Sequence, residues 1–451
     1  MSAAASTGCV HVIGAGLAGL AAAVALADAG RRVILYEAAP HAGGRCRSYF
    51  DAELGCRIDN GNHLLLAGNR AALDYLERIG ALGSLEGPPE AVFPFVDAAT
   101  GERWTVRPNS GALPWWVLRA KRRVPQTRAR DYLAAWALRR ADPSTTIAAA
   151  LDPRQRLFRR LWEPLAVAAL NTSAEQGSAA LFWRILAETL GRGGAACRPL
   201  LPRGGLSESF VEPALARLHA QGAEIRFGAR LKALMFGADK VSHLVFEAGS
   251  IGLDGADMVI LAVPGAIAAR LVPGLVVPDR HSPIVNAHFR CTPPAGAPFF
   301  VGVIGGAAEW IFRKREVLSV TVSAADRFVE RAVLELRDLF WRDVAVAYRL
   351  PAYPVPPVRI VKERRATFLA SPEQLKRRPL QTTTWRNLLL AGDYVDTGLP
   401  ATIEGAIRSG FAAARLATDC RLQALSQVVA SSGRSPLALT EIEQERHRAL
   451  P

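Results

Sequence analysis

The sequence predicts an α/β fold in which one parallel-sheet domain is assembled from separated segments, with an inserted α+β domain and a helical subdomain. Three observations predict it. A strand–turn–helix–strand pattern opens the chain, a buried strand ending in Gly-Asp lies near residue 390, and helical and mixed segments lie between them. One domain must therefore be closed by both ends of the chain. At 451 residues the chain is long enough for two or three domains.

The opening unit is a strand, a turn, a helix and a second strand. The apolar run 10–13 predicts a short buried strand, and the Ala-rich run 20–29 predicts a helix that ends at Gly30. Residues 32–37 predict the second strand. This order completes a βαβ unit, the unit that binds dinucleotides in many folds.

The turn of this unit has the pattern Gly-x-Gly-x-x-Gly. Gly14 permits the tight turn, Gly16 lets the backbone approach a pyrophosphate, and Gly19 lets helix and strand pack closely. The N-terminus of the predicted helix presents free N–H groups and a partial positive charge to the phosphates, and the turn residues Leu17 and Ala18 are predicted to contact the cofactor as well. Alone the pattern is weak evidence, but here the flanking strand and helix accompany it.

An acidic residue at the end of the second strand narrows the choice of dinucleotide. Glu37 follows Gly19 by 18 residues, a spacing that places its carboxylate beside the hydroxyl pair of a ribose. An acidic side chain repels a 2′-phosphate, which disfavours NADP. We therefore predict a dinucleotide site that includes Glu37 and its neighbour Ala38.

A Gly-Gly-Arg segment follows the second strand and distinguishes FAD from NAD. Gly43, Gly44 and Arg45 resemble the corresponding segment of the flavin amine oxidase and carotenoid desaturase superfamily, which implies FAD as the cofactor. There the glycines and the arginine lie along the ribityl-pyrophosphate chain, and the planar fork of Arg45 suits two phosphate oxygens. The resemblance also implies that the polar segment Gly61-Asn62-His63 passes close to the flavin ring.

A second flavin-type motif lies near the C-terminus. The strand 388–393 ends in Gly-Asp, and a helix over 402–416 follows the segment Gly-Leu-Pro-Ala-Thr-Ile-Glu. Such an arrangement aims backbone N–H groups at the edge of the flavin where negative charge develops on reduction. The residues that complete the predicted FAD site are Leu231, Gly392, Asp393, Ala401, Thr402 and Ile403.

These motifs predict a Rossmann-like FAD-binding domain in three pieces. Its segments are residues 8–70, 216–270 and 381–425. The remaining parts are a mostly helical segment facing substrate and membrane, an α+β substrate domain and a polar tail, over residues 71–215, 271–380 and 426–451. The predicted helices are 69–79, 129–140, 153–171, 178–190, 326–343 and 402–416. The predicted later strands are 224–227, 242–246, 257–263, 285–290, 309–312, 318–322 and 388–393.

A closer resemblance extends from about residue 10 to residue 413. The chain is similar to the squalene-associated FAD-dependent desaturases, better described as hydroxysqualene dehydroxylases. The segments that carry this resemblance are 162–165 (Trp-Glu-Pro-Leu), 168–172 (Ala-Ala-Leu-Asn-Thr), 310–312 (Trp-Ile-Phe), 361–363 (Val-Lys-Glu), 365–368 (Arg-Ala-Thr-Phe) and 390–410. The resemblance implies that reduced FAD replaces the hydroxyl of hydroxysqualene with hydrogen, giving squalene for hopanoid synthesis. It also implies a long apolar isoprenoid substrate and an electron donor, which the sequence does not identify.

The sequence assigns no general acid for loss of the hydroxyl. His63, Glu163 and Asn171 are polar residues in the segments that carry the resemblance, and they are the candidates. No Ser-His-Asp or Cys-His arrangement stands out, so the cofactor is expected to carry the chemistry. Two other functions stay open: a carotenoid- or terpenoid-type FAD-dependent desaturase, and a non-catalytic flavoprotein that docks on membranes. An amine oxidase is disfavoured because no aromatic pair for the flavin face stands out.

Composition indicates an intracellular globular protein. The chain has no run of about 18 apolar residues and no signal peptide, which predicts a cytoplasmic location. The six cysteines are scattered, with no Cys-x-x-Cys pair, and no metal site is predicted.

Basic charge is concentrated in one stretch. Residues 103–160 hold fourteen Lys or Arg and three acidic residues, which accounts for +11 of the net charge of +14. Adjacent tryptophans precede four of these cations, a combination that suits a lipid headgroup boundary. The predicted membrane-facing residues are Trp115, Trp116, Arg119, Lys121, Arg122 and Arg123. We expect peripheral contact with the anionic inner face of the cytoplasmic membrane; a buried Trp pair beside a solvated basic helix is the alternative, and nucleic acid is not an expected partner.

Overall fold

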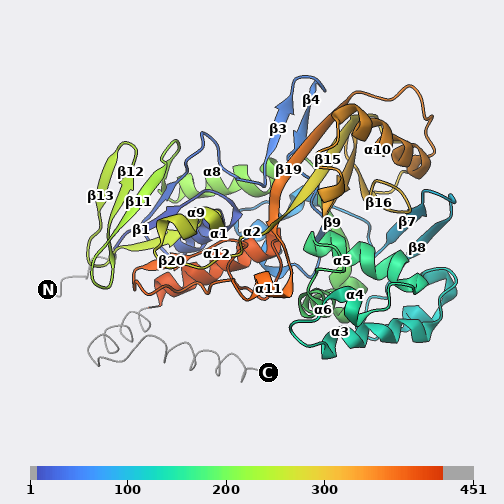
Figure 1. The fold of residues 1–451 in the computed structure, drawn as a ribbon. Helices are drawn as coiled ribbons and strands as arrows, with labels where there is room; N and C mark the ends of the chain where they lie inside the picture. The colour runs from blue at the N-terminus through green and yellow to red at the C-terminus, as the bar shows by residue number, and fades with distance from the viewer. Residues whose placement is uncertain (1–7, 420–451) are drawn as a thin grey trace.

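The computed structural model describes residues 8–419 and confirms the predicted fold class. Five parallel strands form the sheet of the first domain, in the order β10-β2-β1-β14-β20 (Figure 1). The strands are β1 (Val10–Ile13), β2 (Val33–Tyr36), β10 (Glu224–Arg226), β14 (Met258–Leu261) and β20 (Leu388–Leu390). They come from the start, middle and end of the described chain, so this domain is assembled from separated segments.

Both faces of this sheet are covered. One face carries the helices α1 (Leu17–Asp28), α2 (Arg70–Arg78), α8 (Glu212–Ala220) and α12 (Ile403–Thr418). The other face carries α9 (Gly265–Leu271) and the small antiparallel sheet β11 (Leu231–Phe236), β12 (Val241–Phe246) and β13 (Gly249–Gly252). Two-sided cover explains why β1, β2, β14 and β20 are buried along their whole length instead of alternating.

The second domain is built around a seven-stranded sheet in the order β19-β15-β18-β17-β16-β7-β8. The strands are β7 (Phe93–Asp97), β8 (Arg103–Val106), β15 (His281–Arg290), β16 (Phe300–Ile304), β17 (Trp310–Arg313), β18 (Val317–Val322) and β19 (Val358–Phe368). The helix α10 (Val333–Tyr348) packs against Val285, Ala287 and Phe289 on one face. Because side chains alternate along a strand, Asn286 and His288 lie on the opposite face.

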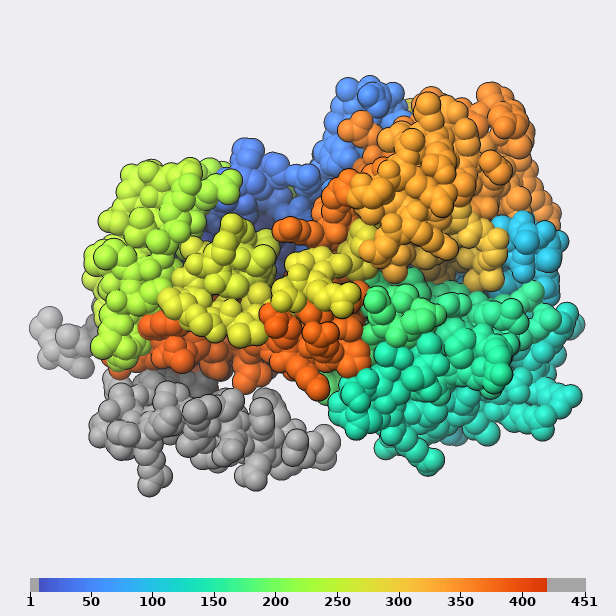
Figure 2. Space-filling view, in the orientation of Figure 1, coloured from blue at the N-terminus to red at the C-terminus, as the bar shows by residue number. Residues whose placement is uncertain are grey.

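A helical segment lies beneath the second sheet and packs against its aromatic part (Figure 1). Its α-helices are α3 (Trp136–Arg140), α4 (Ile147–Ala150), α5 (Glu163–Leu170), α6 (Ala179–Glu188) and α7 (Gly194–Cys197). A π-helix, Phe158–Trp162, precedes α5. The space-filling view shows this segment as the lower right part of the molecule (Figure 2).

Short elements complete the described chain. The pairs β3 (Ser48–Asp51) with β4 (Cys56–Asp59), and β9 (Pro199–Pro202) with both β5 (Leu65–Leu66) and β6 (Leu85–Glu86), lie where the domains meet. The remaining elements are α11 (Pro372–Leu375) and the 3₁₀ turns Leu82–Ser84, Trp115–Leu118, Ala120–Arg122, Ala129–Ala135, Leu190–Arg192 and Ala325–Arg327, with a π-turn at Ser207–Val211. Within residues 8–419, no helix has both the length and the apolarity that crossing a bilayer requires. The predicted polar tail, residues 426–451, lies outside the described residues.

The segment 71–215 is mainly helical, and it also supplies β7 and β8 to the sheet of the second domain. Two local predictions are wrong. The helix predicted over 326–343 begins at Val333, after a separate 3₁₀ turn, and runs to Tyr348 because Val344, Ala347 and Tyr348 extend its buried face. The predicted helix 129–140 is a 3₁₀ segment followed by one α-helical turn and a half.

The predicted membrane-facing position is also wrong for Trp116. Its side chain is only 5% exposed and packs edge-on against Tyr132, whose ring in turn packs edge-on against Trp162. The neighbouring Trp115 is 43% exposed. The two tryptophans therefore have different environments. Trp116 is a core residue that fixes this segment, and Trp115 is a surface residue.

Candidate active site

The glycine turn of the first domain has the geometry that a dinucleotide requires. Gly14 has φ +106°, and a Cβ there would lie 2.5 Å from the carbonyl oxygen of Ala262. A Cβ on Gly19 would lie 1.8 Å from the carbonyl oxygen of Gly14, so the helix packs directly on the turn. Both positions therefore need glycine for the fold itself.

Gly16 differs from these two glycines because a Cβ there would meet no atom within 4 Å. The space in front of Gly16 is open, and no side chain of the described residues caps the N-terminus of α1 behind it. Gly43 forms a parallel β-bridge with Gly16, and Gly44 lies against it. Uncapped N–H groups facing open space form a place for an anion.

Glu37 lies beside the same turn at the end of β2. Its carboxylate accepts hydrogen bonds from the backbone N–H groups of Ala15 and Ala39, each at 2.8 Å. The N–H group of Ala229 donates to the Glu37 carbonyl at 2.8 Å, which brings the start of β11 and Leu231 to this end of the sheet. Glu37 and Leu231 thus lie close to the glycine turn, whereas Ala38 is an exposed residue.

Arg45 connects the two predicted flavin motifs. Its Nη2 lies 2.7 Å from Oδ2 of Asp393, and its Nη1 donates to the carbonyl of Ala366 on β19. Asp393 follows Gly392, whose N–H group donates to Oγ of Ser409 at 2.8 Å. The Arg45 side chain is 48% exposed, so part of the guanidinium remains accessible to a ligand. The structure therefore places residues 45 and 393, far apart in sequence, in one ion pair.

The start of α12 is organised by its own side chains. Oγ1 of Thr402 accepts from the N–H group of Gly405 at 3.1 Å, and Ile403 is buried in the core. The buried carboxylate of Glu404 accepts from the N–H groups of Ala71 and Ala72, which begin α2. Glu404 thus caps a neighbouring helix, and the segment that precedes it, with Ala401, lies at the junction of the two domains.

These observations fit the diphosphate and ribityl parts of FAD. The open backbone at Gly16, the uncapped N-terminus of α1 and the accessible guanidinium of Arg45 are the groups that a diphosphate binds. The bridge between Gly43 and Gly16, with Gly44 against Gly16, brings the residues that precede Arg45 to the glycine turn.

A buried polar network faces this cradle from the second domain. Nδ2 of Asn62 donates to Oγ of Ser319 at 2.7 Å and to Oγ1 of Thr321 at 2.8 Å. Ser319 Oγ also lies 2.7 Å from Nδ1 of His288, and Thr321 donates to Oδ1 of Asn286 at 2.7 Å. The two partners of Asn62, and the residues His288 and Asn286 bonded to them, lie on the face of the sheet opposite α10.

Two atoms of this network have no partner among the described residues. Oδ1 of Asn62 and Nε2 of His288 are buried without a hydrogen bond. An unpaired buried polar atom costs roughly 1–3 kcal/mol, which a bound molecule with a donor or acceptor would recover. The polar network is therefore able to bind a polar group between the two domains.

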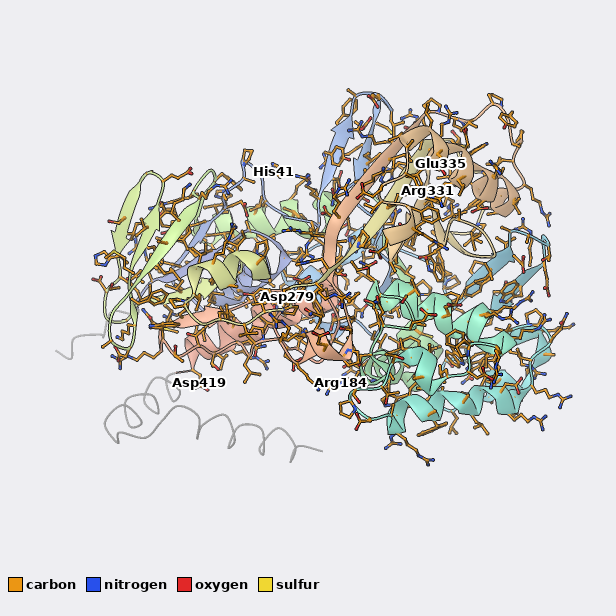
Figure 3. All side chains as sticks on the ribbon, in the orientation of Figure 1. His41, Arg184, Asp279, Arg331, Glu335 and Asp419 are labelled. Atoms are coloured by element: carbon orange, nitrogen blue, oxygen red, sulfur yellow. The ribbon has the colours of Figure 1, made fainter. Side chains whose placement is uncertain are left out.

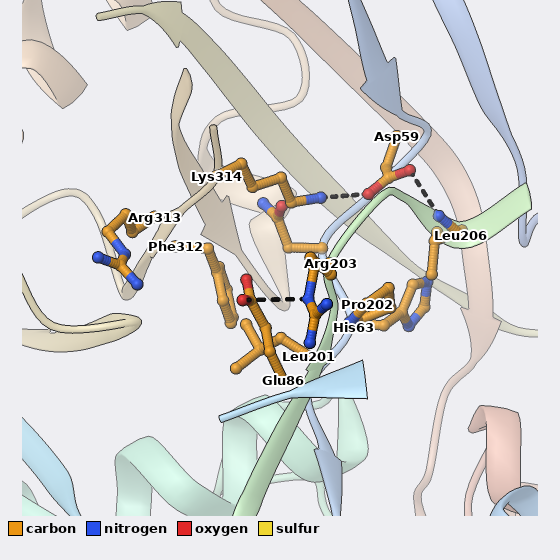
Figure 4. A pocket seen from close by; sticks show the side chains of 11 residues that line it. Asp59, His63, Glu86, Leu201, Pro202, Arg203, Leu206, Phe312, Arg313 and Lys314 are labelled. Atoms are coloured by element: carbon orange, nitrogen blue, oxygen red, sulfur yellow. Dashed lines mark hydrogen bonds and ion pairs between the residues drawn. The ribbon is translucent and has the colours of Figure 1, made fainter. Parts of the chain in front are cut away.

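A narrow pocket lies next to this network (Figure 4). Asp59, His63 and Lys314 form its polar wall, and Leu201 and Phe312 contribute apolar surface. Burial alone would raise the pKa of Asp59, but its ion pair with Lys314 and hydrogen bonds from Ser48 and Leu206 hold it below its ordinary value of 3.8. Asp59 is therefore charged and paired at neutral pH.

Burial also controls the protonation of His63. It is the main cause that lowers the pKa of the imidazole from its ordinary value of 6.5 to about 4; the charge of Asp59 opposes this shift, and the charges of Lys314 and Arg45 add to it. His63 is therefore neutral near pH 7, and its ring is able to hold one hydrogen bond as a donor and one as an acceptor.

This lowered pKa predicts a pH-dependent stability. The folded state binds fewer protons at His63 than the unfolded chain between about pH 4 and pH 6.5, so stability falls as the pH is lowered through that window. Between pH 7 and pH 4.5 the free energy of unfolding of the wild type should decrease. In His63→Gln we expect this decrease to be smaller by about 2 kcal/mol, as measured by urea unfolding. His219→Gln, an exposed histidine on α8, is the matched control and should keep the wild-type dependence. An unchanged slope in His63→Gln would contradict this account.

Asn171 and Glu163, the other two candidates for assisting loss of the hydroxyl, lie at the far end of the polar face. Asn171 ends α5 in a left-handed conformation, donates to the Ser282 carbonyl and to Thr367, and accepts from the N–H group of Ala324 at 2.7 Å. Its amide is thus occupied in joining three segments, which indicates a positioning role. Glu163 begins α5, and burial raises the pKa of its carboxyl.

Glu309 is a site residue that the sequence did not single out. Its Oε2 accepts from the N–H group of Ser323 at 2.8 Å, directly along β18 from Ser319 and Thr321. Burial is the main cause that raises the pKa of Glu309 to about 7; the charge of Glu163 acts in the same direction, and the Ser323 N–H group and the charge of Arg327 oppose it. A buried carboxyl that titrates near neutrality is suited to donate a proton.

Lys314, His288, Ser319 and Thr321 were also not predicted as site residues. Each belongs to a strand of the second domain or directly follows one, and none lies in a glycine-rich or otherwise distinctive motif. The signal available was the alternation Leu318-Ser319-Val320-Thr321-Val322, in which both halves prove to be buried.

Comparison with known proteins agrees with this geometry. Residues 17–418 match the family of flavin containing amine oxidoreductases. Two solved structures share the fold: putrescine oxidase, with a TM-score of 0.65, 16% identity and coverage of 90% of this chain and 98% of that one, and cyclohexylamine oxidase from Brevibacterium oxydans, with a TM-score of 0.63, 17% identity and coverage of 92% and 100%. The cofactor of the chain is FAD.

Closer relatives cover nearly the whole chain. The hydroxysqualene dehydroxylase of Zymomonas mobilis subsp. mobilis is 47% identical over 407 residues, which is 90% of this chain and 98% of that protein. The hydroxysqualene dehydroxylase of Rhodopseudomonas palustris is 48% identical over 410 residues, 90% of this chain and 97% of that protein. A probable zeta-carotene desaturase of Synechococcus elongatus is 40% identical over only 76 residues, 17% of this chain and 16% of that protein. The chain is an FAD-dependent oxidoreductase and belongs to the hydroxysqualene dehydroxylase family.

Proposed function

We propose that the chain catalyses the FAD-dependent reductive dehydroxylation of hydroxysqualene to squalene, a step in hopanoid synthesis. The observation that carries this proposal is the buried polar face between the domains, with unpaired atoms on Asn62 and His288. The full-length similarity to the hydroxysqualene dehydroxylases supports the substrate.

The inner face of the second sheet is polar at one end and aromatic at the other. This arrangement suits a long apolar molecule with one hydroxyl. On β18, Ser319 and Thr321 are polar, and the residues directly opposite them on β17 are Phe312 and Trp310. The aromatic surface continues to Phe300 on β16. We assign the hydroxyl of the substrate to the polar end and its hydrocarbon chain to the aromatic end.

The reaction replaces a carbon–oxygen bond with a carbon–hydrogen bond and releases water. Bound in its reduced form, FAD supplies a hydride to the carbon that loses the hydroxyl. The groups proposed to bind its diphosphate and ribityl chain are Gly14, Gly16, Gly19, Gly43, Gly44, Arg45, Gly392 and Asp393, and Glu37 is proposed to bind the ribose hydroxyls. An electron donor, not yet identified, must return the cofactor to the reduced state after each turnover.

The protein must also deliver a proton to the departing hydroxyl. We assign this proton to the carboxyl of Glu309, whose pKa is raised to about 7 by burial. Glu163 favours the protonated form of Glu309 by its charge. His63, neutral near pH 7, and Asn62 orient the hydroxyl instead of protonating it. The apolar wall of the site excludes water from the carbon that becomes positively charged.

Anaerobic turnover tests the proposal. Protein carrying chemically reduced FAD and mixed with hydroxysqualene should form about one squalene per flavin, while protein with oxidised FAD should form none. Absence of squalene would remove the proposed reaction. Formation of a more unsaturated product from a polyene by the oxidised protein would favour the carotenoid-type desaturase, and bound FAD without any turnover would favour a non-catalytic flavoprotein.

A further inference from the structure

The helical segment exposes large apolar side chains beside clustered cations. Five side chains between positions 113 and 136 form this exposed surface, which we call the tryptophan surface. Their exposed fractions are 81% for Leu113, 43% for Trp115, 70% for Leu118, 64% for Leu133 and 48% for Trp136. They belong to the lower right part of the molecule in Figures 1 and 2. Single exposed apolar residues are ordinary, but five within one short stretch indicate a contact surface.

The charges around this surface are almost all positive. Residues 111–141 hold eight Lys or Arg and one acidic residue, Asp131. The guanidinium groups of Arg119 and Arg122 each lie 5.1 Å from the ring centre of Trp115, and that of Arg139 lies 5.4 Å from the ring centre of Trp136. Each exposed tryptophan is therefore flanked by cations.

The backbone that carries this surface is held in place. Asn109 binds the carbonyls of Gly111 and Leu113 and the N–H group of Trp116. Arg123 donates to the carbonyls of Val117 and Thr127. Trp116 is buried beneath the loop. Arg123 and Trp116 thus hold the loop from its inner side. The backbone that carries the exposed apolar side chains is therefore fixed in position.

We propose that the tryptophan surface docks on an anionic lipid bilayer, with Trp115 and Trp136 at the headgroup level and the leucines among the acyl chains. Tryptophan beside arginine and lysine suits this boundary, because the ring is half buried while the cations meet lipid phosphate. Positive charge complements the negative surface of the bilayer. Nucleic acid would use the same cations but gains nothing from Leu113, Leu118 and Leu133.

This inference does not depend on the proposed reaction. The apolar substrate proposed above would be found in the same bilayer, yet docking requires no substrate and no turnover. Failure of one is therefore distinguishable from failure of the other.

Vesicle sedimentation of the full chain with bound FAD tests the docking. The protein should bind vesicles of phosphatidylglycerol and phosphatidylcholine at low salt, and binding should weaken as salt rises or as the anionic lipid is removed. Arg119→Glu with Lys121→Glu, both exposed, should weaken binding by a factor on the order of 10 to 100. Leu118→Asp with Leu133→Asp should have a similar effect at any salt concentration.

Matched controls lie on distant surfaces. Leu334, next to Glu335 on α10, is 64% exposed, as Leu133 is, so Leu334→Asp should leave vesicle binding unchanged (Figure 3). Arg270→Glu with Arg342→Glu changes the charge by the same amount away from the tryptophan surface. All variants should keep their flavin absorbance, which shows that they are folded.

Four results would overturn the docking proposal, three of them in the vesicle assay. They are absence of binding to anionic vesicles, equal loss of binding in the control variants, and binding that responds to the cations but not to the leucines. A protein that prefers single-stranded DNA to vesicles in competition would also overturn it, because the surface would then serve nucleic acid. Quenching of Trp115 and Trp136 fluorescence by brominated acyl chains, lost in Trp115→Phe with Trp136→Phe, would support insertion.

Discussion

Gly16→Val is expected to give folded protein that does not retain FAD. A Cβ at this position meets no atom of the described chain within 4 Å, so we expect the substitution to leave the domain intact. It instead occupies the space through which a diphosphate approaches the N-terminus of α1. Loss of two charge-assisted hydrogen bonds, roughly 1.5 kcal/mol each, lowers FAD affinity on the order of 100-fold.

Flavin absorbance after gel filtration and the far-ultraviolet circular dichroism spectrum measure this result. Gly255→Val is the matched control, because a Cβ at Gly255 also meets no atom within 4 Å and this residue lies on the exposed loop between β13 and β14. Gly19→Val should instead fail to fold, since its Cβ would overlap the Gly14 carbonyl. A Gly16→Val protein with a full complement of FAD would show that the diphosphate binds elsewhere.

Lys314→Met is expected to destabilise the protein by about 3–5 kcal/mol, because it leaves the buried carboxylate of Asp59 without its counter-charge. The Asp59 side chain is 3% exposed, so water cannot replace Lys314. Urea unfolding measures the loss. Asp59→Asn with Lys314→Met should recover much of it, because the Asn oxygen is able to accept from Leu206 and Ser48 as Asp59 does.

The pH dependence distinguishes this explanation from a simple loss of packing. In the wild type the lowered pKa of Asp59 gives stability that is present above pH 3.8 and lost as the pH falls through the folded value. Without Lys314, burial raises the pKa of Asp59 instead, so the folded state binds the additional proton. The stability deficit of Lys314→Met relative to the wild type should therefore shrink as the pH is lowered from 7 toward 4, and a deficit that stays constant with pH would contradict the role of the charge.

The parallel-sheet domain was predictable because its signals are local. The glycine turn, the strand that precedes it and the helix that follows lie within one short stretch, and α12 (Ile403–Thr418) was predicted as 402–416. Placing β7 and β8 was not possible from local pattern. Their partner β16 lies some 200 residues further along the chain, and nothing in residues 93–106 specifies that pairing.

The candidate site was predictable on one side only. Asn62 and His63 stand in a distinctive polar segment between apolar runs, whereas Ser319 and Thr321 alternate with apolar residues. That alternation is typical of a strand with one face in water, so it does not reveal that the polar face is buried against Asn62. The same reason applies to His288 on β15, which also alternates with apolar residues. The sequence also could not show which of the adjacent residues Trp115 and Trp116 is buried, because that depends on their packing against distant residues.

Deuterium incorporation into squalene tests the central claim most directly. The hydrogen that reduced flavin transfers exchanges with water, so anaerobic turnover of hydroxysqualene by the reduced protein in heavy water should give squalene with one deuterium on the carbon that lost the hydroxyl. Mass spectrometry of the product measures this. Squalene without deuterium, or no squalene at all, would contradict the account of an FAD site closed by Arg45 and Asp393 that reduces the substrate.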